Sequence, residues 1–112
     1  MNSTVKISAA LALAACVSVS QAVLASTAAP TAVTIQQYAF SPATVTIAVG
    51  ATVEWTNRDD DPHTVRSAPE GGELKSPALD TKDTYRFTFK TPGTYKYFCT
   101  LHPHMQGTVI VR

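Results

Sequence analysis

The sequence predicts an all-β protein, either a β-sandwich or a β-barrel, on three observations. Short stretches of the chain alternate apolar and polar residues, which is the pattern of half-buried strands. Glycine and proline fall between these stretches, where turns are needed. No segment has the apolar periodicity of an amphipathic helix. Regularly spaced strands without helices are typical of sandwiches and barrels.

The expected strands follow this alternation along the chain. Val45, Ile47 and Val49 alternate with small or polar residues, and Gly50-Ala51 then turns the chain. The strands expected on this basis cover residues 45–49, 53–56, 83–90, 95–98 and 107–111.

The segments between the strands carry residues that favour loops. An aspartate-rich loop covers residues 58–62, and a turn covers residues 91–94. Residues 67–81 contain two prolines and two glycines, so we expect mostly loop there, with one short edge strand. We expect a core that holds Phe40, Trp55, Phe87, Phe89 and Phe98. Tyr85, Tyr95 and Tyr97 are expected either in this core or half-buried with the hydroxyl at the surface.

The start of the chain has the layout of a secretory signal peptide. Lys6 supplies a positive charge, residues 7–19 form an apolar run, and small residues follow. The run is too short to span a bilayer as a mature helix. We therefore expect a cleaved signal over residues 1–25, a flexible leader over 26–34 and one folded domain over 35–112.

A lipoprotein signal is a second interpretation of the same segment. Leu13-Ala14-Ala15-Cys16 resembles the bacterial lipoprotein box, in which Cys16 becomes the lipidated first residue. Residues 17–25 stay apolar, whereas lipoprotein tethers are polar, so we favour ordinary cleavage near Ala25. Either route exports the protein, most simply to a bacterial periplasm, and only lipidation at Cys16 would attach it to a membrane.

Charge and cysteine content narrow the possible functions. The formal net charge of +1 offers no basic face for nucleic acid. Removal of the signal leaves Cys99 as the only cysteine, and a lone thiol forms no internal disulfide. The sulfur of Cys99 therefore needs another partner in an oxidising compartment.

The loop CTLHPHM near the C-terminus suggests a metal as that partner. It holds Cys99, His102, His104 and Met105, and the third histidine, His63, ends the aspartate-rich loop. Thiolate and thioether are soft ligands and imidazole is borderline, so two histidines, one cysteine and a distant methionine are typical of a blue-copper site. In a sandwich, these two loops can meet at one end.

Either histidine of this loop can join Cys99 on chemistry alone. His102 lies three residues from both Cys99 and Met105, so a tight turn can bring all three around one ion. Pro103 fixes the backbone between the two histidines, and neighbouring side chains tend to point apart. We assign His102 as the ligand and expect His104 to face away.

Other sites fit these residues less well. Structural zinc favours four Cys and His ligands, so His104 would have to replace Met105. A nucleophilic Cys/His enzyme fits poorly, because the sequence shows no glycine-rich oxyanion loop. The run Asp59-Asp60-Asp61 does not have the spacing of an EF-hand, so we expect a solvated acidic turn and not a calcium site.

Two blocks of the sequence resemble the cupredoxin family, and most closely its amicyanin branch. The first runs from Phe40-Ser41-Pro42 to Pro62-His63-Thr64-Val65, and the second from Tyr95 to Met105, with Gly107-Thr108-Val109 after it. The spacing Cys-x₂-His-x₂-Met is the shortest ligand loop in that family. The resemblance implies a Greek-key sandwich of about eight strands that binds one type 1 copper ion through His63, Cys99, His102 and Met105.

The resemblance also implies roles for residues around the ligands. Asn57 is expected to tie the two ligand loops together through Thr100, and the backbone N–H of Thr64 to donate to the thiolate. Amicyanin has proline where this chain has Leu101, so Leu101 restores a backbone donor beside Cys99. A second hydrogen bond to the thiolate would stabilise Cu(I), and we therefore expect a higher potential than in Leu101→Pro.

The function expected from this resemblance is the transfer of single electrons by Cu(II)/Cu(I) cycling, without catalysis. His102 is the expected exit for the electron, inside an apolar rim of Leu101, Pro103 and Pro62. The implied partners are a periplasmic dehydrogenase as donor and a c-type cytochrome or an oxidase as acceptor. We expect the protein to act as a monomer.

Two other copper functions, a multicopper oxidase and a copper carrier, fit the sequence less well than electron transfer. A multicopper oxidase carries a histidine on each side of its cysteine, whereas Phe98 and Thr100 flank Cys99 here. A periplasmic copper carrier or storage protein is the stronger alternative. Such proteins use exposed surfaces rich in methionine and histidine, and the sequence after the signal holds one methionine and three histidines.

Overall fold

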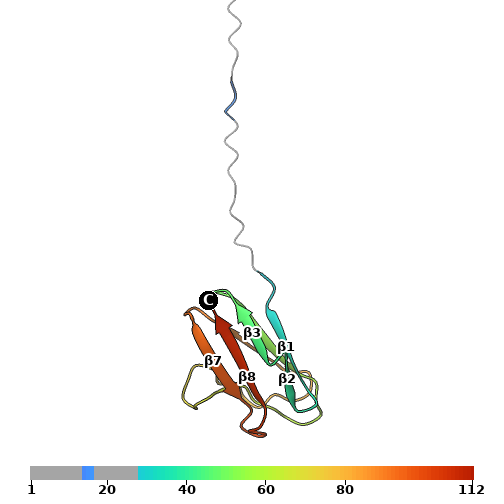
Figure 1. Cartoon of the computed structure of the whole chain (residues 1–112). Coiled ribbons are helices and arrows are strands. Elements are labelled where there is room, and N and C mark those ends of the chain that lie inside the picture. Colours follow the sequence, from blue (N-terminus) through green and yellow to red (C-terminus); the bar gives the residue numbers. More distant parts are fainter. Residues whose placement is uncertain (1–13, 17–27) are drawn as a thin grey trace, which may run out of the picture.

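The computed structural model describes residues 14–16 and 28–112, and the latter range folds into two four-stranded sheets packed face to face (Figure 1). This confirms the predicted all-β sandwich with about eight strands. The strands are β1 (Thr31–Gln36), β2 (Ala39–Ser41), β3 (Thr44–Ile47), β4 (Thr52–Asn57), β5 (Arg66–Ser67), β6 (Thr84–Thr88), β7 (Gly93–Phe98) and β8 (Gln106–Val111).

The first sheet has the strand order β2-β1-β4-β6. Its centre is a parallel pair, in which Val33 of β1 lies opposite Trp55 of β4. Strand β2 pairs antiparallel with β1, and β6 pairs antiparallel with β4. The parallel pair carries β4 through the middle of the sheet, so that the loop after Asn57 leaves at the same end as the β1–β2 turn.

The second sheet has the order β3-β8-β7-β5. Strands β3 and β8 are parallel, while β7 and β8 form an antiparallel pair from Gly93↔Val111 to Phe98↔Gln106. The short segment 99–105 that connects β7 to β8 is therefore a hairpin loop at one end of the sandwich. The chain ends at the opposite end, where Figure 1 marks the C-terminus.

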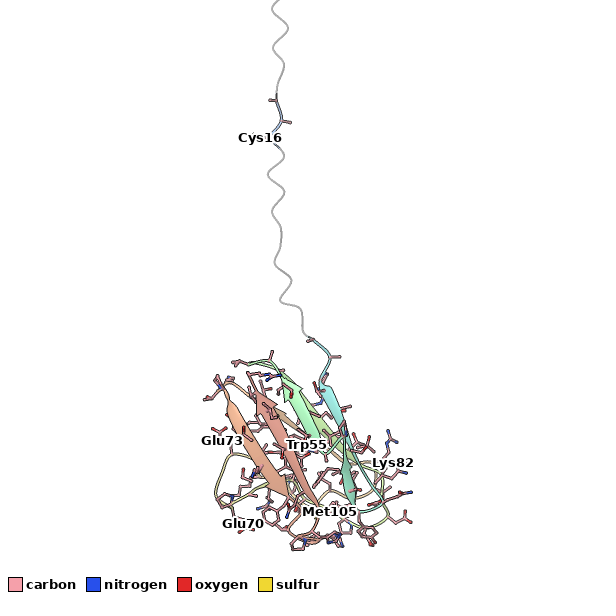
Figure 2. The ribbon with its side chains drawn as sticks, in the orientation of Figure 1. Cys16, Trp55, Glu70, Glu73, Lys82 and Met105 are labelled. Atoms are coloured by element: carbon pink, nitrogen blue, oxygen red, sulfur yellow. The ribbon has the colours of Figure 1, made fainter. Side chains whose placement is uncertain are left out.

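The core lies between the two sheets, on the inward faces of the alternating strands. Trp55 is completely buried and sits in the middle of the sandwich (Figure 2). Tyr97 is 1% exposed and packs edge-on against both Phe40 and Trp55. Of the two predicted placements, core or half-buried, Tyr97 takes the core, because its ring fills the space above Gly107, which has no side chain of its own.

The other aromatic residues divide between core and margin. Phe40 and Phe89 are buried, as predicted, whereas Phe87 and Phe98 are half-buried. Phe87 lies on β6, which is an edge strand of its sheet, so one side of its ring stays accessible.

The domain begins earlier than the sequence predicted. Strand β1 starts at Thr31, so residues 31–34 of the expected flexible leader are part of the first sheet. Val33 and Ile35 are buried and alternate with more exposed residues, which is the pattern of a strand. The predicted leader over 26–34 did not take this alternation into account. The expected signal peptide, residues 1–25, falls outside the described residues except for 14–16 and stays a prediction. Within the described ranges, the structure has no helix of the length and apolarity that crossing a membrane requires.

Candidate metal centre

Two segments supply the four predicted ligand residues at one end of the sandwich. His63 follows β4 by way of the aspartate-rich loop, and Cys99 follows β7 directly. Both of these side chains are completely buried. Met105, labelled in Figure 2, lies just before β8 at the end opposite the C-terminus. The topology therefore brings together residues that are more than 35 positions apart, as the sequence predicted.

The backbone of His63 is fixed by a short antiparallel bridge to Leu79. The N–H of His63 donates to the Leu79 carbonyl at 3.1 Å, and the N–H of Leu79 donates back at 2.7 Å. Leu79 belongs to the long segment between β5 and β6, which the sequence predicted as mostly loop. This segment therefore serves to hold the first histidine in place.

The Cys99 loop is closed by hydrogen bonds of its own backbone. The N–H of Cys99 donates to the Met105 carbonyl at 3.1 Å, and the N–H of Met105 donates to the His102 carbonyl at 2.9 Å. These bonds extend the β7–β8 ladder by one step and then turn the chain tightly. Three of the predicted ligand residues, Cys99, His102 and Met105, are thereby held in one tight backbone loop. Met105 is only 2% exposed.

Three potential ligand atoms converge between the two segments. The Nδ1 atoms of His63 and His102 are 3.2 Å apart, and they lie 3.7 Å and 3.8 Å from the Sγ of Cys99. A point equidistant from all three atoms lies about 2 Å from each, which is close to the length of a metal–imidazole bond. The three side chains therefore form a nearly regular triangle sized to surround one ion.

Of the two histidines in the loop, only His102 lies in this group. His102 is half-buried and turns its Nδ1 toward Cys99, whereas His104 is exposed to solvent. Among the described residues, the grouped ligand side chains are His63, Cys99 and His102. The expectation that His104 faces away is confirmed by its exposure.

Asp59 orients His63 within this group. Its Oδ2 lies 2.8 Å from Nε2 of His63, and the Asp59 side chain is only 13% exposed. A carboxylate accepts hydrogen bonds, so the single hydrogen of a neutral His63 ring is on Nε2 and Nδ1 presents its lone pair to the other ligands. The sequence predicted a solvated acidic turn at residues 59–61, and for Asp59 this was wrong.

The hydrogen bonds to Asp59 also keep its carboxylate charged. Burial by itself raises the pKa of this group, but the N–H donors of Tyr38, Gln37 and His63 outweigh burial and lower the pKa from its ordinary value. Asp59 therefore supplies a negative charge on the far side of the His63 ring from the three potential ligand atoms.

The two segments are cross-linked by Thr64 and not by Asn57. The Oγ1 of Thr64 accepts the backbone N–H of Thr100 at 2.8 Å and shares a hydrogen bond with the Thr100 hydroxyl at 2.9 Å. Asn57 instead bonds within its own side of the site, to the carbonyls of Asp61 and Leu79. The predicted Asn57–Thr100 link is therefore wrong, because the Asn57 amide is used to shape the aspartate-rich loop.

Hydrogen bonds to the cysteine sulfur come from the same threonine. The backbone N–H of Thr64 lies 3.4 Å from Sγ of Cys99, which confirms the predicted donor, and the Thr64 hydroxyl lies at 3.9 Å. Within the described part of the chain, the backbone N–H of Leu101 makes no hydrogen bond to this sulfur. The side chain of Leu101 is 49% exposed and lies beside His102 at the surface.

The donor set of this group is suited to a soft, redox-active metal. One thiolate and two imidazole nitrogens around one point, with a methionine on the same loop as the cysteine, match the preference of copper, whereas hard cations prefer oxygen ligands. The carboxylate behind His63 and the N–H aimed at Sγ are the outer contacts that such ligands require. The residues present therefore fit a copper ion.

Comparison with known proteins agrees with this geometry. The chain matches the family model of the cupredoxin-like domain over residues 8–111. Amicyanin-alpha from Methylorubrum extorquens is 39% identical over 94 residues, which cover 81% of this chain and 79% of that protein. Amicyanin from Paracoccus denitrificans is 46% identical over 68 residues, which cover 58% of this chain and 52% of that protein.

Solved structures give the same result. A reduced form of an amicyanin variant superposes with a TM-score of 0.69 at 35% identity, covering 74% of this chain and 82% of that one. The family model spans nearly the whole chain, and the fold agrees with it. This protein therefore belongs to the cupredoxin-like family.

Proposed function

We propose that the protein is a type 1 blue copper protein that carries single electrons between redox proteins. The observation that carries this proposal is the triangle of His63 Nδ1, His102 Nδ1 and Cys99 Sγ, with sides of 3.2, 3.7 and 3.8 Å. We assign these three residues as the equatorial ligands and Met105 as the weak axial ligand.

The copper ion, when bound, supplies a one-electron couple between Cu(II) and Cu(I). The chain supplies contacts that hold two of the proposed ligands in place. His63 is fixed by Asp59 and by Leu79, and Cys99 is fixed by its backbone bond to Met105. Rigid ligands keep the structural rearrangement small, which favours fast electron transfer and leaves no open position for a substrate.

Electrons are exchanged through the half-buried His102. His63 is completely buried, whereas Leu101 and Pro103, the chain neighbours of His102, are exposed, as is Pro62 next to His63. A small apolar rim of this kind suits a brief encounter with another redox protein, since transient redox complexes bury little surface. We propose a periplasmic dehydrogenase as donor and a c-type cytochrome or oxidase as acceptor, with the protein acting as a monomer.

The proposed location is the periplasm, and it rests on the signal-like N-terminal segment. Apolar residues 7–19 with Lys6 before them are typical of exported proteins. Mass spectrometry of the mature N-terminus tests this directly. A chain that starts near residue 26 supports export and cleavage, and a lipidated Cys16 would add a membrane anchor.

A copper carrier or storage protein is the second candidate, and the burial of the site argues against it. Cys99 and His63 are completely buried and Met105 is 2% exposed, so a partner cannot reach these ligands without opening the loop. Voltammetry of the copper-loaded protein separates the two functions. A reversible one-electron wave with slow copper loss supports the shuttle, whereas rapid transfer of Cu(I) to a chelator would contradict it.

A further inference from the structure

The turn between β1 and β2 is held in a disfavoured conformation by a side chain from the His63 segment. Gln37 and Tyr38 have φ angles of 53° and 56°, where glycine or asparagine is usual. Oδ1 of Asp59 accepts the N–H of Gln37 at 2.7 Å, and Oδ2 accepts the N–H of Tyr38 at 2.9 Å. One carboxylate therefore stabilises both residues of the turn.

The same carboxylate holds the first histidine. Oδ2 of Asp59, which accepts the Tyr38 N–H, also accepts the Nε2–H of His63 at 2.8 Å. The turn and the histidine are thus fixed to each other through a single, largely buried group. A displacement of either one would disturb the other.

This turn places the ring of Tyr38 against both histidines. The ring centroid lies 5.4 Å from that of His63 and 5.1 Å from that of His102, with the planes close to perpendicular in both pairs. The Tyr38 hydroxyl donates a hydrogen bond to the carboxylate of Asp61. The ring is therefore held at its backbone end by Asp59 and at its hydroxyl end by Asp61, while 44% of the residue faces solvent.

We propose that Tyr38 is a cap over the two histidine ligands, and that Asp59 is the positioning residue that sets both the cap and His63. The inference rests on the proposed function, because it takes His63 and His102 to be copper ligands. With its ring across their edges, Tyr38 blocks the approach of external ligands to the metal. It also limits rotation of the half-buried His102 away from Cys99.

Copper loss tests the cap. Protein loaded with Cu(I) is mixed with the chelator bathocuproine disulfonate, and the release rate is measured for wild type, Tyr38→Ala and Tyr38→Phe. Tyr38→Ala removes two ring contacts, so we expect release about tenfold faster. Tyr38→Phe keeps the ring, so its rate should stay close to wild type. A Tyr38→Ala protein that releases copper at the wild-type rate overturns the cap.

A matched pair of charge variants tests the positioning role. Asp59→Asn and Asp60→Asn each remove one negative charge, but Asp60 is exposed and makes no side-chain hydrogen bond with the described residues. We expect Asp59→Asn to raise the reduction potential more than Asp60→Asn and to weaken copper binding by about 10- to 100-fold. Equal shifts in the two variants would refute the role of Asp59.

A measurement on the unaltered chain covers the case in which Asp59→Asn does not fold. The ¹⁵N–¹H NMR signal of His63 Nε2 is expected to be visible in the Cu(I) protein, because the hydrogen bond to Asp59 slows exchange with water. Rapid exchange of this hydrogen would contradict the positioning role.

Labelling of the metal-free protein separates this inference from the proposed function. Cys99 is buried beneath the histidines, and peptide mapping distinguishes its alkylation by iodoacetamide from that of Cys16. We expect faster labelling of Cys99 in Tyr38→Ala than in Tyr38→Phe, and equal rates would overturn the cap. A wild-type protein that binds no copper would refute the proposed function, while the labelling result would still decide whether Tyr38 covers the site.

Discussion

The two histidines of the metal centre are held in opposite ways. His63 is completely buried, its Nε2 is bonded to Asp59, and its backbone is bridged to Leu79. His102 is half-buried, lies on a loop between two strands, and makes no Nε2 hydrogen bond within the described part of the chain. One side of the site is built into the fold, and the other side faces the surface.

This difference separates two requirements of an electron carrier. The ligands must not rearrange when the charge of the metal changes, and the electron must still reach a partner. The buried segment meets the first requirement through Asp59, which accepts one hydrogen bond from His63 and two from the β1–β2 turn. The hairpin loop meets the second by bringing the ring of His102 close to the exposed Leu101.

Removal of each histidine in turn is the strongest test of this contrast. His63→Gly and His102→Gly should both abolish the blue absorption, because each removes one of the three proposed strong ligands. Added imidazole should restore the colour of His102→Gly, where the cavity opens to the surface, and not that of the buried His63→Gly. Equal rescue in visible titrations would contradict the contrast.

The core residue Tyr97 serves as a reference, because a change in the core should affect the His63 segment and the His102 loop equally. Burial raises the pKa of the Tyr97 hydroxyl to about 12, whereas the same group in the unfolded chain has a pKa of about 10. Between these two pH values the folded state keeps the hydroxyl proton and the unfolded state loses it. The unfolded state then binds fewer protons, and stability falls as the pH rises from about 10 to 12, by roughly 2–3 kcal/mol for two pKa units.

Tyr97→Phe removes this pH dependence. Its hydroxyl has no hydrogen-bond partner among the described residues, so the variant should be about as stable as wild type at neutral pH. Urea unfolding at neutral pH and at pH 11–12 measures both effects. An alkaline loss of stability as large in Tyr97→Phe as in wild type would exclude Tyr97 as its source.

Thr64 joins the two segments, so its substitution should loosen one from the other. Thr64→Val keeps the shape but leaves the N–H of the half-buried Thr100 without its acceptor, which costs about 0.5–1.5 kcal/mol. Thr64→Ser keeps the hydroxyl and serves as the control. Urea unfolding in which the two variants are equally stable would show that the cross-link contributes nothing.

The smallest effect is expected at Leu101. Without a hydrogen bond from its N–H to Cys99, Leu101→Pro should leave the reduction potential close to that of Leu101→Ala, which controls for loss of the side chain. This replaces the larger shift that the sequence alone predicted. Voltammetry that shows a much lower potential in Leu101→Pro would restore the earlier interpretation.

Most strands could be predicted from the sequence, because alternation is a local property. The exception is instructive, since β1 and β2 also alternate but no glycine, proline or asparagine marks the turn between them. Gln37 and Tyr38 adopt positive φ angles, and their N–H groups are both accepted by Asp59, which is more than twenty residues away. A turn stabilised from a distance leaves no signal in its own residues.

The proposed ligand residues could be picked out from the sequence for a different reason, which is chemical rarity. Cysteine, methionine and histidine are scarce in this chain and gather in one loop, so their grouping is visible without a structure. Aspartates are common, and three in a row give no indication of which one turns inward. Only the folded chain distinguishes Asp59, bonded to His63, from the exposed Asp60.

The visible spectrum during addition of Cu(II) tests the central claim, that Cys99 and two imidazoles hold one copper ion, most directly. The wild-type protein should develop an intense absorption toward the red, from charge transfer between thiolate and copper, that saturates at one equivalent. Cys99→Ser should stay colourless. Copper uptake without this band, or an equal band in Cys99→Ser, would contradict the account.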